Sequence, residues 1–454
     1  MFDRVLVANR GEIAVRVIRA LHELGIEAVT VFSTADREGL HVELADQAVC
    51  IGPPAATDSY LRISNVVAAA ETTGCDAVHP GYGFLAENAA FVGACEENDL
   101  VFIGPSAEIV ERMGDKVRAK EAMREAGVPL VPGSDGASGA RVGDLRRAAV
   151  EAGFPVLLKA SAGGGGKGMR LVSSEDDLED AVAAASTEAE AAFGDGSLYV
   201  EKLVSPARHV EIQVLCDSAG GVLTLGEREC SIQRRHQKLV EESPSTALDP
   251  ETREAMESTV ERACLAIGYR NAGTFEFLVG PDGAFYFIEV NCRLQVEHPV
   301  SELVTGIDIV KEQIRIAAGE PLSETGRAAR RGHAIEIRIN AEDPARGFVP
   351  SPGTVTRFSP PLGPGVRVDT AVGSGTEIPP YYDSMIAKVI VWDGTRDASI
   401  VRAERALGEL VVEGIPTTRE LALDVLASPE FRRGEYSTST LADLEGRAPS
   451  LAVS

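Results

Sequence analysis

Cysteine and long apolar runs are both scarce in this sequence. The seven cysteines among 454 residues stand singly, with no CxxC pair, which excludes a disulfide-stapled scaffold and a cysteine-type zinc site and indicates a reducing compartment. No apolar stretch approaches the ~18 residues that a membrane-spanning helix needs. The N-terminus, MFDRVLVANRGE, carries acids and arginine around its only apolar run, unlike a signal peptide. These absences predict a soluble cytoplasmic protein with no membrane partner.

Basic residues are also in short supply. Lys and Arg number 44 against 69 Asp and Glu, which gives a formal net charge of −25. A chain this acidic repels nucleic-acid backbones and anionic membrane surfaces, so we expect no nucleic-acid partner. Any phosphate ligand must be held by local clusters of cations.

The N-terminal quarter of the chain has the pattern of an α/β protein. Residues 1–114 alternate short apolar runs with amphipathic stretches, which is typical of βαβ units and an open, mostly parallel sheet. Asn9 and Glu12 resemble a capping box at the start of the first helix, and Gly25 is predicted to end it. No GxGxxG follows the first strand, so a dinucleotide fingerprint is absent.

The rest of the chain predicts two more domains, in keeping with ~150 residues per domain. Residues 115–318 form the second, and they include a glycine-rich subdomain over 131–203. The hairpins and helices of this region are followed by residues 332–445, for which we expect a small mixed sheet with a helix packed behind it. One helix is expected near 301–318.

A glycine-rich loop lies between two predicted strands. Gly163–Gly166 and Gly168 expose successive backbone N–H groups that suit phosphate oxygens. The loop is not a Walker A motif, because Gly rather than Ser or Thr follows Lys167 and a strand follows rather than a helix. Such a hairpin is typical of a mobile lid over a triphosphate, and a floppy connector is the alternative. Lys159 and Lys116 nearby favour the lid.

Two acidic residues are predicted to meet across a hairpin. Asp282-Gly283 is a preferred pair for a tight turn, and a hairpin centred there places Glu276 opposite Glu289 with Cβ atoms roughly 5 Å apart. Like charges in this position are destabilising unless a divalent cation lies between them, and Mg²⁺ carried on substrate phosphates is the natural candidate. Asn291 would point to the same face. A solvated hairpin face, or a register broken by a bulge, is the alternative.

The segment RLQVEHP follows this hairpin directly. If it stays extended, as the residue before proline prefers, Arg293, Gln295 and Glu297 share one face. A guanidinium beside a carboxylate holds a small planar anion while the carboxylate takes its proton. A salt-bridged strand face is the alternative.

Two other polar segments are weaker signals. In HAIEIRIN, Glu336, Arg338 and Asn340 alternate with isoleucines, a pattern that most often describes a solvent-facing strand. The basic run QRRHQK, from Gln233 to Lys238, is either a solvated loop or the local cation cluster that phosphates require.

Together these segments resemble the biotin carboxylases, which are ATP-grasp enzymes. The shared stretches include ANRGEIA, HPGYGFLAEN, MGDK, KASAGGGGKGMR, ERECSIQRRHQKLVEE, FIEVNCRLQVEHPVSE, RINAEDP and PPYYDSMIAK, in order from residue 4 to about 389. Cys292 stands where the family often has Thr, and Ala162 where a further Gly is frequent. The resemblance implies a pre-ATP-grasp domain, an ATP-grasp domain with a lid, and a C-terminal domain.

The resemblance also implies roles for individual residues. The positions that correspond to ATP-binding residues of the family are Lys116, Lys159, Gly165, Gly166, Met169, Glu201, Lys202, Leu203, His209, Gln233, His236 and Leu278. Those for Mg²⁺, or Mn²⁺ in its place, are Glu276, Glu289 and Asn291. Those for bicarbonate are Lys238, Arg293, Gln295 and Val296, with Glu297 as the base and with Arg338 and Tyr82 at the biotin ring. The implied catalytic set is Arg293, Glu297, Arg338 and Lys238.

The reaction implied is the ATP-dependent carboxylation of biotin. Bicarbonate attacks ATP to give carboxyphosphate, which decays to CO₂ and phosphate, and the phosphate deprotonates biotin. None of the six methionines adjoins a lysine, so the Met-Lys-Met biotinylation signal is missing. We therefore expect biotin on a separate carboxyl carrier protein, carboxyltransferase partners, a homodimer and a place in acetyl-CoA carboxylase and fatty acid synthesis. Another ATP-grasp carboxylate–amine ligase, or a silent nucleotide-binding scaffold, is the alternative.

Overall fold

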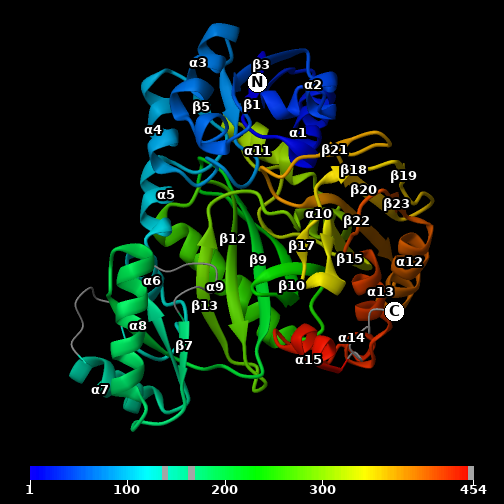
Figure 1. The fold of residues 1–454 in the computed structure, drawn as a ribbon. Helices are drawn as coiled ribbons and strands as arrows, with labels where there is room; N and C mark the ends of the chain where they lie inside the picture. The colour runs from blue at the N-terminus through cyan, green and yellow to red at the C-terminus, as the bar shows by residue number, and fades with distance from the viewer. Residues whose placement is uncertain (135–141, 162–168, 448–454) are drawn as a thin grey trace.

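The computed structural model describes residues 1–134, 142–161 and 169–447. Gly165 and Gly166, and with them the glycine loop predicted to be a lid, lie outside the described residues. Figure 1 shows an N-terminal α/β unit at the top, a long central sheet, a small unit at the lower left and the C-terminal elements at the right. No helix in the described ranges is long and apolar enough to cross a membrane.

The N-terminal sheet is parallel throughout, as predicted. Its order is β3-β2-β1-β4-β5. The strands are β1 Arg4–Val7, β2 Glu27–Ser33, β3 Gln47–Gly52, β4 Ala77–His79 and β5 Val101–Phe102. The helices are α1 Gly11–Glu23, α2 Leu40–Leu44, α3 Ile63–Thr73, α4 Ala89–Glu97 and α5 Ala107–Gly114. Gly25, with a φ of 74°, follows the end of α1 as expected, because this left-handed conformation costs glycine little.

The predicted capping box is wrong. Arg10 is the N-cap of α1 and makes no side-chain cap. The Asn9 amide instead donates to the carbonyl oxygens of Pro80 and Tyr82, each at 2.7 Å, and Glu12 accepts the Tyr82 hydroxyl. Tertiary partners have taken both side chains, and they tie the start of α1 to the loop after β4.

A small three-stranded antiparallel unit stands apart from the large sheet. It comprises β6 Val156–Ala160, β7 Met169–Val172 and β8 Leu198–Lys202 in the order β7-β6-β8. The helices α7 Val142–Ala152 and α8 Leu178–Phe193 pack on it around a core of their own, at the lower left of Figure 1. The helix α6 Lys116–Glu125 leads into this unit.

The central sheet has the order β13-β12-β9-β10-β11-β15-β22-β20, with β14 beside β10. The strands are β9 Arg208–Cys216, β10 Val222–Arg234, β11 Gln237–Ser243, β12 Asn271–Val279, β13 Phe285–Asn291, β14 Gly326–Arg327, β15 His333–Asn340, β20 Val366–Thr370 and β22 Met385–Asp393. The fold class is confirmed, with one difference in detail. The three longest C-terminal strands do not form a separate sheet, because β15 pairs with β11 and extends the central one.

The remaining C-terminal strands form short pairs beside the large sheet. These are β16 Glu342–Asp343 with β17 Val349–Pro350, β18 Gly353–Thr354 with β21 Glu377–Ile378, and β19 Arg357–Ser359 with β23 Val411–Glu413. The helices of this half are α9 Pro250–Ile267, α10 His298–Thr305, α11 Ile309–Ala317, α12 Arg396–Glu409, α13 Arg419–Ala427, α14 Pro429–Arg433 and α15 Thr440–Arg447. The single helix predicted near 301–318 is two helices, since Gly306 ends α10 with a φ of 78°.

Candidate active site

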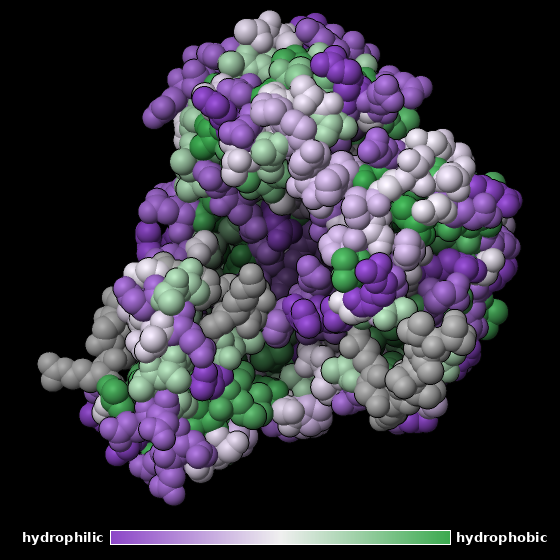
Figure 2. Space-filling model, in the orientation of Figure 1, coloured by the Kyte–Doolittle hydropathy of each residue, from purple (hydrophilic) through white to green (hydrophobic). Residues whose placement is uncertain are grey.

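A cavity of about 980 Å³, with many charged side chains in its lining, lies where the N-terminal unit, the central sheet and the small unit meet. In the space-filling view it is the deep hollow at the centre of the molecule, with hydrophilic residues at its base (Figure 2). Every described residue proposed for the site lines this cavity except Lys202. The Lys202 ammonium donates instead to the carbonyl oxygens of Gly153 and Phe154, at 2.6 and 3.1 Å.

Glu276 of β12 and Glu289 of β13 are directly opposite each other, as predicted. The route to this pairing differs from the predicted one. Near the turn Phe277 pairs with Phe287, one residue out of the expected register, and a bulge between there and Glu276 restores it. A bulge was the alternative that would have separated Glu276 from Glu289, but in the structure it brings them into register.

The two carboxyls have different electrostatic surroundings. Burial raises the pKa of Glu289, and the charge of Glu276 raises it further. Burial also opposes ionisation of Glu276, but Lys238 and His209 outweigh it and hold the pKa of Glu276 well below its usual range. His209 Nε2 lies 2.9 Å from Glu276 Oε2, and Asn291 donates to Glu276 Oε1 at 2.8 Å. Three oxygen-bearing side chains therefore converge, a donor set that suits a hard divalent cation.

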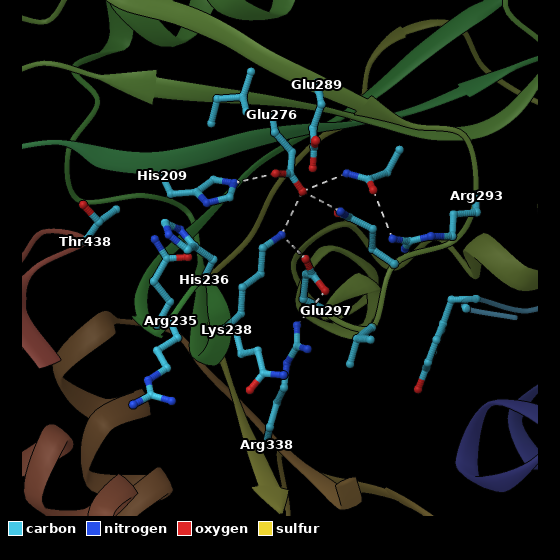
Figure 3. Close-up of a pocket in the computed structure, with 18 of the residues that line it drawn as sticks. His209, Arg235, His236, Lys238, Glu276, Glu289, Arg293, Glu297, Arg338 and Thr438 are labelled. Atoms are coloured by element: carbon cyan, nitrogen blue, oxygen red, sulfur yellow. Dashed lines mark hydrogen bonds and ion pairs between the residues drawn. The ribbon is translucent and has the colours of Figure 1, made fainter. Parts of the chain in front are cut away.

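Lys238 is the cation that joins three buried carboxylates. Its ammonium lies 2.6 Å from Glu211. It also lies 3.0 Å from Glu276 and 2.5 Å from Glu297, and dashed lines mark these two contacts in Figure 3. Burial disfavours the charge of Glu297, yet Lys238 and then Arg338 hold its pKa well below its usual range. Glu297 is thus ionised and able to accept a proton.

Arg338 closes this network from the other side. Its Nε donates to Glu241 at 2.6 Å and its terminal nitrogen to Glu297 at 2.9 Å. The strand HAIEIRIN is not solvent-facing, because Glu336 is fully buried and Asn340 is nearly so. The polar face of this strand is directed into the protein and toward the cavity.

The segment after the hairpin is extended only in part. It turns at Val296 and Glu297, and Glu297 is the N-cap of α10, so the predicted continuous strand face is wrong. Arg293 donates to Glu87 at 2.7 Å, and Gln295 donates to Glu276 at 2.8 Å. The turn nevertheless leaves all of these site residues on the cavity wall.

Cations cluster at the end of the cavity formed by α6 and the small unit. Lys120 and Lys159 both pair with the buried carboxylate of Glu201. Burial lowers the pKa of Lys116, which lines the same wall. The loop between β10 and β11 adds His236, where the backbone takes a positive φ of 67°. Every residue of the basic run QRRHQK except Arg234 therefore lines the cavity.

Several residues of the network had not been singled out from the sequence. Arg228 is fully buried and donates to Glu211, Gln213, Thr274, Gln295 and Ser301. A detectable signal exists in HVEIQVL, where Glu211 and Gln213 alternate with apolar residues on a strand that is otherwise buried. Glu211 also lies directly opposite Glu276 across β9 and β12.

Fold and site together define an ATP-grasp-type ligase, and comparison with known proteins narrows the class. Three family descriptions match in order: "Biotin carboxylase, N-terminal domain" over residues 1–110, "Carbamoyl-phosphate synthase L chain, ATP binding domain" over 115–325, and "Biotin carboxylase C-terminal domain" over 336–443. The chain therefore belongs to the biotin carboxylase family of ATP-dependent carboxylase ligases.

Individual relatives are similar to this protein over almost the whole chain. It is 52% identical over 444 residues to a biotin carboxylase of Nostoc sp., covering 98% of this chain and 99% of the relative. It is 51% identical over 440 residues to a pyruvate carboxylase subunit of Methanothermobacter thermautotrophicus, covering 96% and 89%. A biotin carboxylase structure from Campylobacter jejuni superposes with a TM-score of 0.93 at 48% identity, covering 98% and 99% of the two chains. The biotin carboxylase domain of a Hydrogenobacter thermophilus 2-oxoglutarate carboxylase gives 0.92 at 50% identity, with 98% of each chain covered.

Proposed function

We propose that this protein uses ATP and bicarbonate to carboxylate biotin attached to a separate carrier protein. The observation that carries this proposal is the arrangement around Glu297. This carboxylate is held between Lys238 at 2.5 Å and Arg338 at 2.9 Å, in the same cavity as the opposed acids Glu276 and Glu289. A base, a cation cluster and a metal-type donor set thus share one cavity.

The acid pair fits Mg²⁺, and Mn²⁺ by the same chemistry. Glu276 and Glu289 would hold the ion with Asn291, and a bound ion would neutralise phosphate charge. The directly opposed positions of the two carboxylates support this assignment, because like charges in this arrangement are destabilising unless a cation balances them. ATP would lie against the residues already named for it, with Lys116, Lys159 and His209 facing its phosphates.

Bicarbonate would bind beside Glu297. Arg293, Gln295, Val296 and Lys238 surround this position, and Glu297 would take the proton of bicarbonate as its oxygen attacks the γ-phosphate. The carboxylate is ionised before the anion arrives, and the added negative charge raises its pKa at that moment. Binding of the anion thus moves Glu297 toward accepting the proton.

Biotin would lie at Arg338 and Tyr82. The guanidinium of Arg338 would stabilise the developing negative charge of the ureido oxygen, while the phosphate released from carboxyphosphate takes the proton of the ring nitrogen. Carboxyphosphate is destroyed by water, so the reaction needs a closed site. We assign that closure to the glycine loop that contains Gly165 and Gly166.

The final carboxyl acceptor is a separate question. Relatives of nearly equal identity are named as biotin carboxylase and as part of a pyruvate carboxylase. We propose that the acceptor is acetyl-CoA, and hence that the protein serves fatty acid synthesis with carrier and carboxyltransferase partners. We also propose a homodimer and a cytoplasmic location, with which the seven free cysteines agree. We also propose domains over 1–114, 115–318 and 332–445, with the lid subdomain over 131–203.

The test is ATP hydrolysis by the purified protein. We expect it to require bicarbonate, to rise with free biotin and to fall sharply in Glu297→Gln. Replacement of both requirements by an amino acid would establish a carboxylate–amine ligase instead, and nucleotide binding without any hydrolysis would establish a scaffold. Identification of the biotinylated protein that copurifies tests the proposed acceptor.

A further inference from the structure

The sheet face beneath Arg338 carries charged side chains that have no role in the proposed reaction. Ile335, Ile337 and Ile339 of β15 pack into the C-terminal core. Because side chains alternate along a strand, Glu336 shares the opposite face with Arg338. Glu336 is completely buried and lies directly across from Glu241 of β11, which is also completely buried.

Glu241 and Glu336 are thus a second pair of opposed acids. Oε1 of Glu241 accepts from Arg338 at 2.6 Å. Within the described part of the chain, no hydrogen-bond donor reaches Oε2 of Glu241 or either oxygen of Glu336. Two ionised carboxylates only accept hydrogen bonds, so with both acids ionised these three buried oxygens would have no donor, at a high cost in free energy.

The neighbouring cation does not supply the missing donor. Lys388 of β22 donates to the carbonyl oxygen of Val296 at 2.8 Å and lies 3.1 Å from Glu12. A single proton on one carboxyl engages two of the three oxygens and removes one of the two negative charges, because a protonated acid donates to a carboxylate.

We propose that Glu336 and Glu241 share one proton and that this pair is a positioning device for Arg338. The proton lies on Glu336, whose hydroxyl donates to Oε2 of Glu241, while Oε1 of Glu241 orients the guanidinium. Glu241 is thereby held by Glu336 on one side and by Arg338 on the other. Arg338 then faces two ionised carboxylates, Glu241 and Glu297, and Glu336 is neutral. The role in catalysis rests on the proposed function, because it assumes that Arg338 serves biotin.

The charged groups around Glu336 are consistent with this protonation. They are Lys388 on β22, Glu241 on β11, Arg338 on β15 and Glu297 before α10. Burial has the largest effect and raises the pKa of Glu336 well above its usual range, and Lys388 opposes it less strongly. Burial raises the pKa of Glu241 less, to about 7, so Glu336 is the member of the pair that keeps the proton.

Infrared spectroscopy of the full chain tests the shared proton without any activity. At neutral pH, the difference spectrum between wild type and Glu336→Gln should contain the C=O band of one protonated carboxyl, identified by its shift in protein labelled with ¹³C-glutamate. Glu254→Gln, at an exposed position of α9, should remove no such band. If Glu336→Gln removes none either, the proposal is overturned.

Kinetics test the positioning role. The amide of Glu336→Gln still donates to Glu241, so the biotin-dependent turnover of this variant should stay close to that of wild type. In wild type the turnover should fall at alkaline pH as the pair loses its proton, and in Glu336→Gln this fall should be absent. Glu336→Ala should lose about tenfold or more in that turnover, with the KM for ATP and the biotin-independent, bicarbonate-dependent ATP hydrolysis unchanged. Equal loss in both variants, or an unchanged alkaline fall in Glu336→Gln, would refute the positioning role. A wild type without bicarbonate-dependent hydrolysis would refute the proposed function instead, and the infrared band would still decide the pair.

Discussion

Replacement of Lys238 by methionine should disable the base through charge rather than shape. Methionine keeps the length of the side chain but removes the ammonium that lies between Glu211, Glu276 and Glu297. Removing one partner of a buried ion network costs about 3–5 kcal/mol, because the remaining charges are left uncompensated. Glu276 and Glu297 have a depressed pKa in the folded protein, so their ionisation stabilises the fold above their unfolded pKa and this contribution is lost as pH falls. Without Lys238 both pKa values rise, and the variant should therefore lack this contribution at neutral pH.

The consequence for catalysis is a shifted acid limb. Without Lys238, which opposes the effect of burial most strongly, the pKa of Glu297 should rise toward neutrality. A protonated Glu297 accepts no proton, and loss of a general base costs about 10²–10⁴-fold in rate. We expect bicarbonate-dependent ATP hydrolysis near pH 7 to fall by at least about 10²-fold, with partial recovery as pH rises.

The assay is initial-rate ATP hydrolysis with and without bicarbonate between pH 6 and 9. Lys311→Met is the matched control, because Lys311 makes a surface ion pair with Glu23 and such pairs contribute about 1 kcal/mol or less. A Lys238→Met protein that is folded and has the wild-type rate and pH profile would refute the reasoning.

Three other perturbations separate the parts of the molecule. Arg338→Ala should retain ATP binding and bicarbonate-dependent hydrolysis but lose most biotin carboxylation, and unimpaired carboxylation would remove its assignment. Glu289→Gln should raise the Mg²⁺ concentration for half-maximal rate by at least about tenfold, whereas Asp282→Asn at the tip of the same hairpin should not. Burial opposes ionisation of Glu242, but the hydrogen bond with His333 and then the charge of Arg396 hold the pKa of Glu242 at about 2. Its stabilisation of about 3 kcal/mol is present above its usual pKa and is lost as pH falls toward 2, so Glu242→Gln should flatten the dependence of Tm on pH in that range.

Local patterns were sufficient for the parallel N-terminal sheet and for most strand positions. Alternation and apolar runs determine where strands form, but they do not name the partner of an edge strand. For this reason the pairing of β11 with β15, and hence the single large sheet, was not predicted. Asn9 and Glu12 have the spacing of a cap, yet distant partners in the loop after β4 bind them, and no local rule contains those partners.

The acid pair was found from turn chemistry, although the two-residue turn is not what forms. A bulge compensates for the shifted register, and the strand residues on either side of it, Glu276-Phe277 and Phe287 to Glu289, include no glycine or proline that marks it. Arg228 and Glu211 were overlooked because buried charges on a strand resemble a solvated face until their partners are known. For Glu211 the usable signal is its position between the apolar residues Val210 and Ile212, whereas Arg228 stands between Glu227 and Glu229 and has no such signal.

The pairing of β11 with β15 has a consequence for how the chain can be divided. The metal-type acids are on β12 and β13, and Arg338 is on β15, so one continuous hydrogen-bonded ladder fixes the span between the two ends of the cavity. A fragment that stops before β15 would leave β11 as an exposed edge strand, and such a strand promotes self-association. A chimera that exchanges C-terminal regions between relatives should therefore fold only where the pairing of β11 with β15 is preserved. We expect a junction after β22 to succeed and a junction in the linker before β15 to fail.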